Sequence, residues 1–70
     1  MKTVTLYVVE DKWDETYYGD MISALEAYDE EQGAAAMHEY EFIVPTRPVE
    51  FAAWLNDNTM PLSTREMYRK

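Results

Sequence analysis

The chain has 70 residues, and its 14 acidic and 6 basic side chains give a formal net charge of −8 at pH 7. It has no cysteine, so neither a disulfide framework nor a thiolate zinc site can stabilise it. Its length predicts a single domain over residues 1–70, whose small core can hardly spare a small-molecule pocket of roughly 300 Å³ or more. The negative charge repels nucleic acid phosphates and anionic membranes, so direct binding to either is not expected. These properties count against an enzyme and favour a protein-binding role.

The negative charge is concentrated in one part of the sequence. Residues 10–41 hold eleven acids and a single base, Lys12, whereas the segments on either side each have a small positive excess. A surface with a field of this sign attracts basic partners.

Two strands are expected before the first helix. Residues 3–9 alternate at period two, and their valine, threonine and tyrosine content favours a strand. Charged, turn-prone residues follow at positions 10–14. Residues 15–18 are then expected to return as a short second strand, which makes a hairpin.

A helix is expected over residues 21–32. Asp20 suits the N-cap position, because its carboxylate can accept an unsatisfied backbone N–H of the first turn. The apolar side chains recur at helical spacing and form one stripe: Met21, Ala24, Leu25 and Tyr28.

A further strand and a second short helix follow. Residues 34–37 either extend the first helix or begin the strand, and the pattern leaves both open. Residues 38–44 alternate as a half-buried strand does, and Pro45 ends it. The second helix begins near Pro48, since proline is suited to a first turn. The residues expected to end it are Asn56, Asp57 and Asn58.

The segment 60–70 is polar and basic. Ser63 and Glu66 have the spacing of a capping box, which allows one terminal turn of helix, and a frayed tail is the alternative. The fold class expected is therefore α+β, a small antiparallel sheet of two to three strands packed against one main helix and a second short helix. The side chains expected in the core are Tyr28, Tyr40, Phe42, Phe51 and Leu55, and Trp13 or Tyr17 is expected to be exposed.

Few residues suit catalysis or metal binding. His38 is the single histidine, and a lone histidine on a strand is more often a packed or edge-exposed side chain than a base. Four acids lie close in sequence and offer oxygen ligands for calcium or magnesium, but they lack the EF-hand spacing and are better explained by the turn and the helix cap: Asp11, Asp14, Glu15 and Asp20. We expect no enzyme activity, no catalytic residue, no cofactor and no metal.

The carboxylates form the one positive indication of function. Glu26 and Glu30 are one helical turn apart, about 6 Å along the axis, and Glu39 and Glu41 lie about 6.6 Å apart on one strand face. Such an array indicates a decoy for a basic groove, and a solvated face that keeps the protein soluble is an equally weighted alternative. The residues expected to bind a partner are the acids Glu26, Asp29, Glu30, Glu31, Glu39 and Glu41, with Trp13, Tyr17 and Tyr18 as aromatic anchors.

In size and acidity the chain resembles the small proteins that phages use against host defences, including anti-CRISPR proteins and DNA mimics. The resemblance is one of composition, and it involves no motif and transfers no functional residue. It implies a cytoplasmic inhibitor, in the host cytoplasm if phage-encoded, that binds a basic surface of a nucleic-acid-handling protein. The absence of a signal peptide and of a membrane-spanning segment fits a cytoplasmic location.

An interaction module that is not a mimic is the alternative, such as an antitoxin or an accessory protein that self-associates as a homodimer. It would use a hydrophobic patch, or residues 3–9 or 38–44 if either strand lies at the sheet edge.

Overall fold

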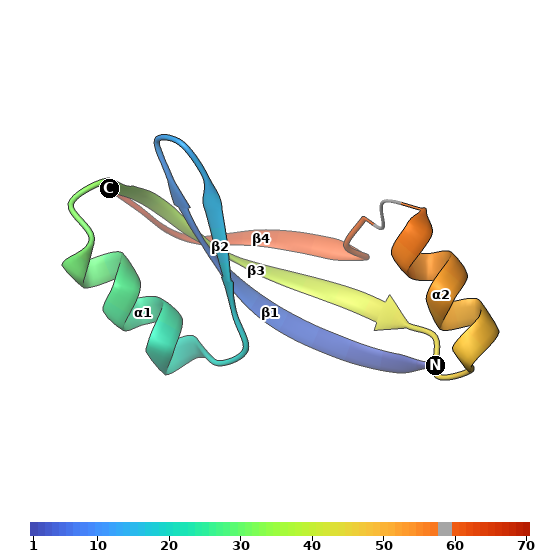
Figure 1. Cartoon of the computed structure of the whole chain (residues 1–70). Coiled ribbons are helices and arrows are strands. Elements are labelled where there is room, and N and C mark those ends of the chain that lie inside the picture. Colours follow the sequence, from blue (N-terminus) through green and yellow to red (C-terminus); the bar gives the residue numbers. More distant parts are fainter. Residues whose placement is uncertain (58–59) are drawn as a thin grey trace.

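Four strands pair in one antiparallel sheet with the order β2-β1-β3-β4. The architecture is that of a computed structural model, which describes residues 1–57 and 60–70. The elements in chain order are β1 (Lys2–Asp11), β2 (Glu15–Tyr18), α1 (Met21–Glu30), β3 (Ala34–Val44), α2 (Pro48–Asn56) and β4 (Ser63–Arg69) (Figure 1). The molecule measures 41 × 21 × 17 Å, and α1 and α2 lie at its opposite ends (Figure 1).

The expectation of two to three strands is wrong, because the segment considered as a helical turn or a frayed tail forms β4. Its backbone pairs with β3, with Arg65 opposite Glu39 and Thr64 opposite Tyr40. Six of the seven β4 residues are exposed, so the strand lacks the apolar alternation of a half-buried strand. An edge strand held by its backbone hydrogen bonds and rich in charged side chains gives little periodic signal in the sequence.

β1 and β3 occupy the centre of the sheet, and neither is a free edge as the strand-edge hypothesis requires. β1 lies between β2 and β3, and β3 lies between β1 and β4. Residues 34–37, which the pattern left open, begin β3. β2 is short and pairs only with residues 7–10 of β1. The edge strands of the sheet are therefore β2 and β4.

The register of β1 and β3 divides the sheet into two faces, because residues directly opposite each other point to the same side. The side that α1 covers, here called the helix face, carries Val9 opposite Met37. The other side, here called the open face, carries Val4 opposite Phe42.

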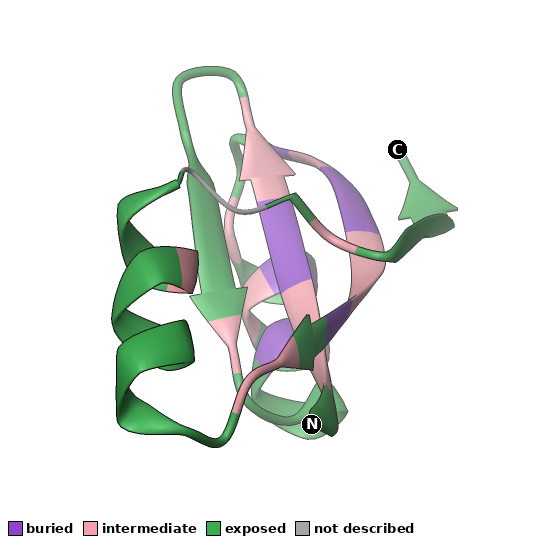
Figure 2. Ribbon diagram, turned by 90° about the vertical axis from the view of Figure 1, so that its right-hand side faces the viewer, coloured by how far each residue is buried: buried purple, intermediate pink, exposed green. Residues whose placement is uncertain are grey.

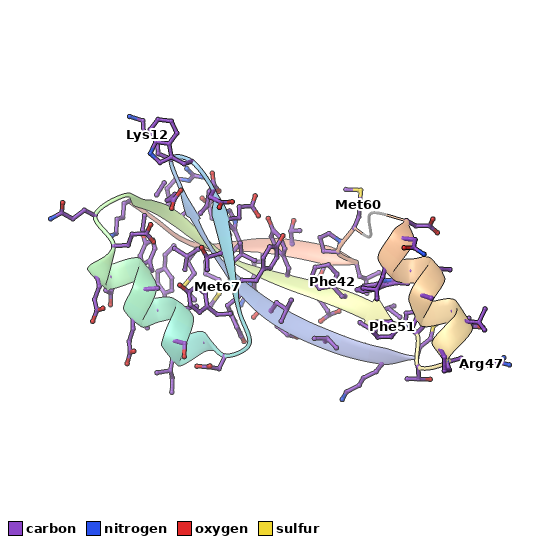
Figure 3. All side chains as sticks on the ribbon, viewed as in Figure 1. Lys12, Phe42, Arg47, Phe51, Met60 and Met67 are labelled. Carbon is purple, nitrogen blue, oxygen red and sulfur yellow. The ribbon has the colours of Figure 1, made fainter. Side chains whose placement is uncertain are left out.

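The core cluster lies between α1 and the helix face, and Val8, Ala36 and Phe42 are also buried, on the open face (Figure 2). Met37 is fully buried in the cluster, and it packs with Ala24 and Tyr28 of α1. Met67 of β4 reaches into the space between the sheet and α1 (Figure 3). The buried members of this cluster are Val9, Ala24, Tyr28, Ala34 and Met37.

Both ends of α1 are capped. The Asp20 carboxylate accepts a hydrogen bond from the backbone N–H of Ser23 at 2.8 Å, as expected for the N-cap. The helix ends at Glu30, two residues earlier than expected. The Lys70 ammonium donates to the carbonyl of Tyr28 at 2.6 Å and lies 4.7 Å from the centre of its ring. A cation at this position satisfies a free carbonyl and complements the helix dipole.

α2 makes little contact with the rest of the protein. It begins at Pro48 as expected and ends at Asn56; Asn58, named for its end, lies outside the described residues. Trp54 is the one α2 side chain that is not exposed, and its ring lies 6.3 Å from that of Phe42. Within residues 1–57 and 60–70, neither helix has the length and apolarity needed to cross a membrane.

The core expectations are partly confirmed. Tyr28 and Phe42 are buried, and Tyr40 is half-buried. Phe51 and Leu55 were expected in the core and are exposed, because the core lies at the α1 end and only Trp54 anchors α2 to the open face. Trp13 and Tyr17 are both exposed, as expected for at least one of them.

Replacing Met37 by alanine tests the position of the core. Met37 is fully buried between α1 and the sheet, so Met37→Ala should lower the free energy of unfolding by about 2–5 kcal/mol. Urea denaturation followed by circular dichroism measures this. Ile22, which is 70% exposed on α1, is the matched control, and Ile22→Ala should change the value by less than about 0.5 kcal/mol. Equal effects of the two substitutions would contradict this core.

Candidate functional site

The outer side of α1 carries three exposed carboxylates. α1 turns Ala24 and Tyr28 toward the sheet, which leaves Glu26, Asp29 and Glu30 in solvent. None of the three forms an ion pair with a side chain in the described part of the chain. Because Glu26 and Glu30 are one turn apart, their charges lie about 6 Å apart along the axis. The helix therefore presents uncompensated negative charge to solvent.

The β1–β2 hairpin adds further acids at the same end of the molecule. The Asp11 carboxylate accepts hydrogen bonds from the backbone N–H groups of Trp13 and Asp14, both at 2.7 Å, and these bonds shape the turn. Lys12 lies at the hairpin tip (Figure 3), and its ammonium lies 5.5 Å from the ring centre of Trp13, which is 86% exposed. The turn acids thus have structural partners in the backbone.

Glu31 connects the hairpin to the end of α1. Its interaction with the Asp11 side chain, together with burial, raises the pKa of Glu31. The nearby Lys70 charge acts in the opposite direction. The backbone N–H groups of Trp13 and Asp14, followed by Glu31, lower the pKa of Asp11. Glu31 therefore contacts the β1–β2 hairpin from the end of α1, whereas the acids of α1 are freely solvated.

Glu39 and Glu41 lie on the helix face of β3 and are half-buried. The Arg65 guanidinium of β4 lies 3.3 Å from the Glu39 carboxylate, and these two residues are directly opposite in the β3–β4 ladder. Pairing with Arg65 reduces the charge that Glu39 presents to a partner. Glu39 is accordingly a weaker member of the expected binding set than the acids of α1, and Glu41 is half-buried without an ion pair in the described residues.

The three aromatic residues expected as anchors do not all lie on one surface. Tyr17 lies on the open face, where its ring meets that of Tyr40 edge-on at 6.2 Å. Tyr18 faces the other way and packs against the core cluster. Trp13 and Tyr17 both line an open hollow beside the hairpin, so two of the three expected anchors share a surface and Tyr18 does not.

The charge differs between the two ends of the molecule. One end of the molecule, here called the α2 end, consists of α2, the turns around it and the neighbouring termini of β1 and β3. It carries two bases and two acids: Lys2, Arg47, Glu50 and Asp57. The remainder of the chain, which includes α1, the hairpin and β4, carries 12 of the 14 acids and 4 of the 6 bases. The whole net charge of −8 is therefore carried by that remainder.

The open face contains two features that the sequence did not predict, a Glu10–His38 pair and an apolar groove beside α2. His38 Nε2 lies 2.8 Å from a carboxylate oxygen of Glu10, although the two are distant in sequence. Burial is the main cause that raises the pKa of Tyr40, next to this pair, and the Glu15 charge adds to it. The β1–β3 register brings Glu10 and His38 together, since Val8 lies opposite His38. No local pattern in the sequence could have found this pair.

A groove of about 280 Å³ lies between the open face and α2. Its lining is mostly apolar and consists of Val4, Leu6, Tyr17, Phe42, Val44 and Trp54. The open hollow beside the hairpin is larger and is lined mostly by charged residues of the turn. In the described part of the chain, no three histidine, aspartate or glutamate side chains come together as a set of metal ligands.

Comparison with protein-family models, curated proteins and solved structures gives no match to this chain.

The Asp11–Glu31 pair makes a pH-dependent contribution to stability that can be measured. Because the folded protein raises the pKa of Glu31, protonated Glu31 stabilises the fold at low pH, and this contribution is lost as the pH rises above the ordinary value of 4.5. Glu31→Gln keeps a donor toward Asp11 at every pH. It should raise the thermal unfolding midpoint at pH 7, and the gain should vanish near pH 4.

Glu26→Gln is the control for this experiment, because it removes the same charge from a solvated position of α1. The difference between the two variants isolates the carboxyl pair. A gain for Glu31→Gln that equals the gain for Glu26→Gln at pH 7, or that persists unchanged at pH 4, would contradict the pairing.

Proposed function

We propose that this protein is a small, non-enzymatic inhibitor that binds a basic surface of a nucleic-acid-handling protein in place of nucleic acid. The exposed acids of α1 carry the proposal, because Glu26, Asp29 and Glu30 form an array without basic partners in the described residues. A basic groove built for phosphates would recognise such an array by charge. No cofactor is part of this function.

The position of these acids supports a role other than stability. Asp29 and Glu30 lie in the last turn of α1, where negative charge interacts unfavourably with the helix dipole, and the Lys70 ammonium bound to the carbonyl of Tyr28 offsets only part of this cost. Glu26 and Glu30 also repel each other across one turn. A domain of this size has little stability to lose. Carboxylates that reduce stability at this position are explained if they contact a partner.

The proposed partner is a basic protein, and the proposed site of action is the cytoplasm, in the host cell if a phage encodes the chain. The charge would accelerate the encounter and set the orientation, while neighbouring exposed groups such as Trp13 would add contact area. The proposal agrees with the compositional resemblance to small phage proteins that act against host defences, which include anti-CRISPR proteins and DNA mimics.

Charge reversal on α1 tests this function. The tagged protein is used to capture partners from a lysate at about 50 mM salt, and the captured proteins are identified. Wild type should retain a nucleic-acid-handling protein, and binding should fall about tenfold or more near 200 mM salt because the complex depends on screened charges. Glu26→Lys/Glu30→Lys should lose the partner at both salt concentrations.

The matched control is Glu15→Lys/Glu66→Lys, which makes the same change in net charge at two exposed positions outside both helices. It should retain the partner. A partner that stays bound to the α1 variant, or a complex that is insensitive to salt, would overturn the proposal.

A second candidate function is interaction through an apolar patch, and the groove beside Trp54 favours it. In this case the α1 variant would bind its partner as the wild type does. The strand-edge form of this hypothesis lacks support, because β1 and β3 both lie inside the sheet.

A further inference from the structure

Too few residues of the protein pack against α2 for this helix to be stable by itself. It has nine residues and no buried side chain, with Val49 83% and Leu55 60% exposed. Helices shorter than about 12–15 residues are marginal in water unless an apolar face is packed against something. On the sheet side, the Trp54 ring packs against Phe42 of β3, and the Phe51 ring lies 5.9 Å from that of Trp54. Its remaining apolar side chains have no such cover, so α2 needs a second surface to pack against.

The size of the missing surface can be estimated. The exposed area is 5200 Å², whereas a compact monomer of 8.3 kDa has about 4,600 Å². The radius of gyration is 13.5 Å, compared with about 11 Å for a compact domain of 70 residues. The extended shape thus exposes about 600 Å² more per chain than a compact monomer, and a symmetric pair in which each copy covered an area of that size would bury about 1,200 Å², the lower limit for a specific stable interface.

The charges near α2 identify the kind of partner. Arg47 and Lys2 balance Glu50 and Asp57, so this end has no net charge. A two-fold interface brings each surface against a copy of itself, which requires balanced charge. Everywhere else the chain is strongly acidic and repels its own copies. The α2 end is thus the part of the molecule on which a second copy can dock.

We propose that the protein is a homodimer in which the α2 ends of two copies pack against each other about a two-fold axis. Val49 and Leu55 of each copy lie in this interface. The groove beside Trp54 receives apolar α2 side chains of the second copy, and its volume of about 280 Å³ is sufficient for them. Because α1 lies at the far end (Figure 1), the dimer keeps its two acidic surfaces apart and free to bind.

The mass of the protein in solution tests the dimer. Light scattering of the eluting wild type should give twice the 8.3 kDa of one chain. The thermal unfolding midpoint should rise with protein concentration, as it does when association stabilises the fold. Added salt should strengthen the dimer, since it screens the repulsion between two negatively charged copies. This is opposite to its effect on the partner complex proposed above.

Val49→Lys and Leu55→Lys should each give a monomer whose circular dichroism retains the sheet signal. Ile22→Lys, which makes the same apolar-to-charged change on α1, should remain dimeric. A wild type that is monomeric at every concentration, with a constant unfolding midpoint, would overturn the proposal. A dimer that survives both α2 substitutions and dissociates with Ile22→Lys would place the interface on α1 and overturn it equally. Neither result depends on whether α1 binds a basic protein.

Discussion

The packing of α1 against one end of the sheet is the interaction on which the rest of the structure depends. Met37, Val9 and Ala34 provide the sheet side of this contact, and Ala24 and Tyr28 provide the helix side. β4 also contributes, because Met67 packs against the cluster and the Lys70 ammonium binds the carbonyl of Tyr28. A chain of 70 residues has enough apolar surface for one such core. The α2 end is left without one.

This single core explains how charge and apolar surface are divided. At the α1 end, the buried side chains support a helix whose outer side can carry unpaired carboxylates at some cost in stability. At the α2 end, exposed apolar side chains are available for association, and the charges there are balanced. The two proposed roles, binding of a basic partner and dimerisation, therefore use separate surfaces. A dimer built in this way would offer two equivalent acidic helices to a partner, and two linked contacts bind more tightly than one.

Local patterns in the sequence predicted the elements that have strong periodicity or clear capping. β1, α1 with its Asp20 cap, β3 and the start of α2 at Pro48 are examples. β4 was missed because an exposed edge strand has no apolar alternation, and its capping-box spacing indicated a helix. Phe51 and Leu55 were misplaced because their apolar character says nothing about whether the sheet reaches them. In the candidate site, the α1 acids were predictable from helical spacing. The pairing of Glu39 with Arg65 and of Glu10 with His38 depends on strand register, which no local pattern contains.

The central claim is that the chain has one core and that α2 lacks a surface to pack against. Hydrogen exchange of the backbone amides tests this claim most directly when it is measured on dilute and on concentrated protein. We expect the amides of β3 and α1 to exchange slowly at both concentrations, because they belong to the core. The amides of α2 should exchange slowly only in the concentrated sample. Amides of α2 that are as protected as those of β3 in the dilute protein would contradict the claim.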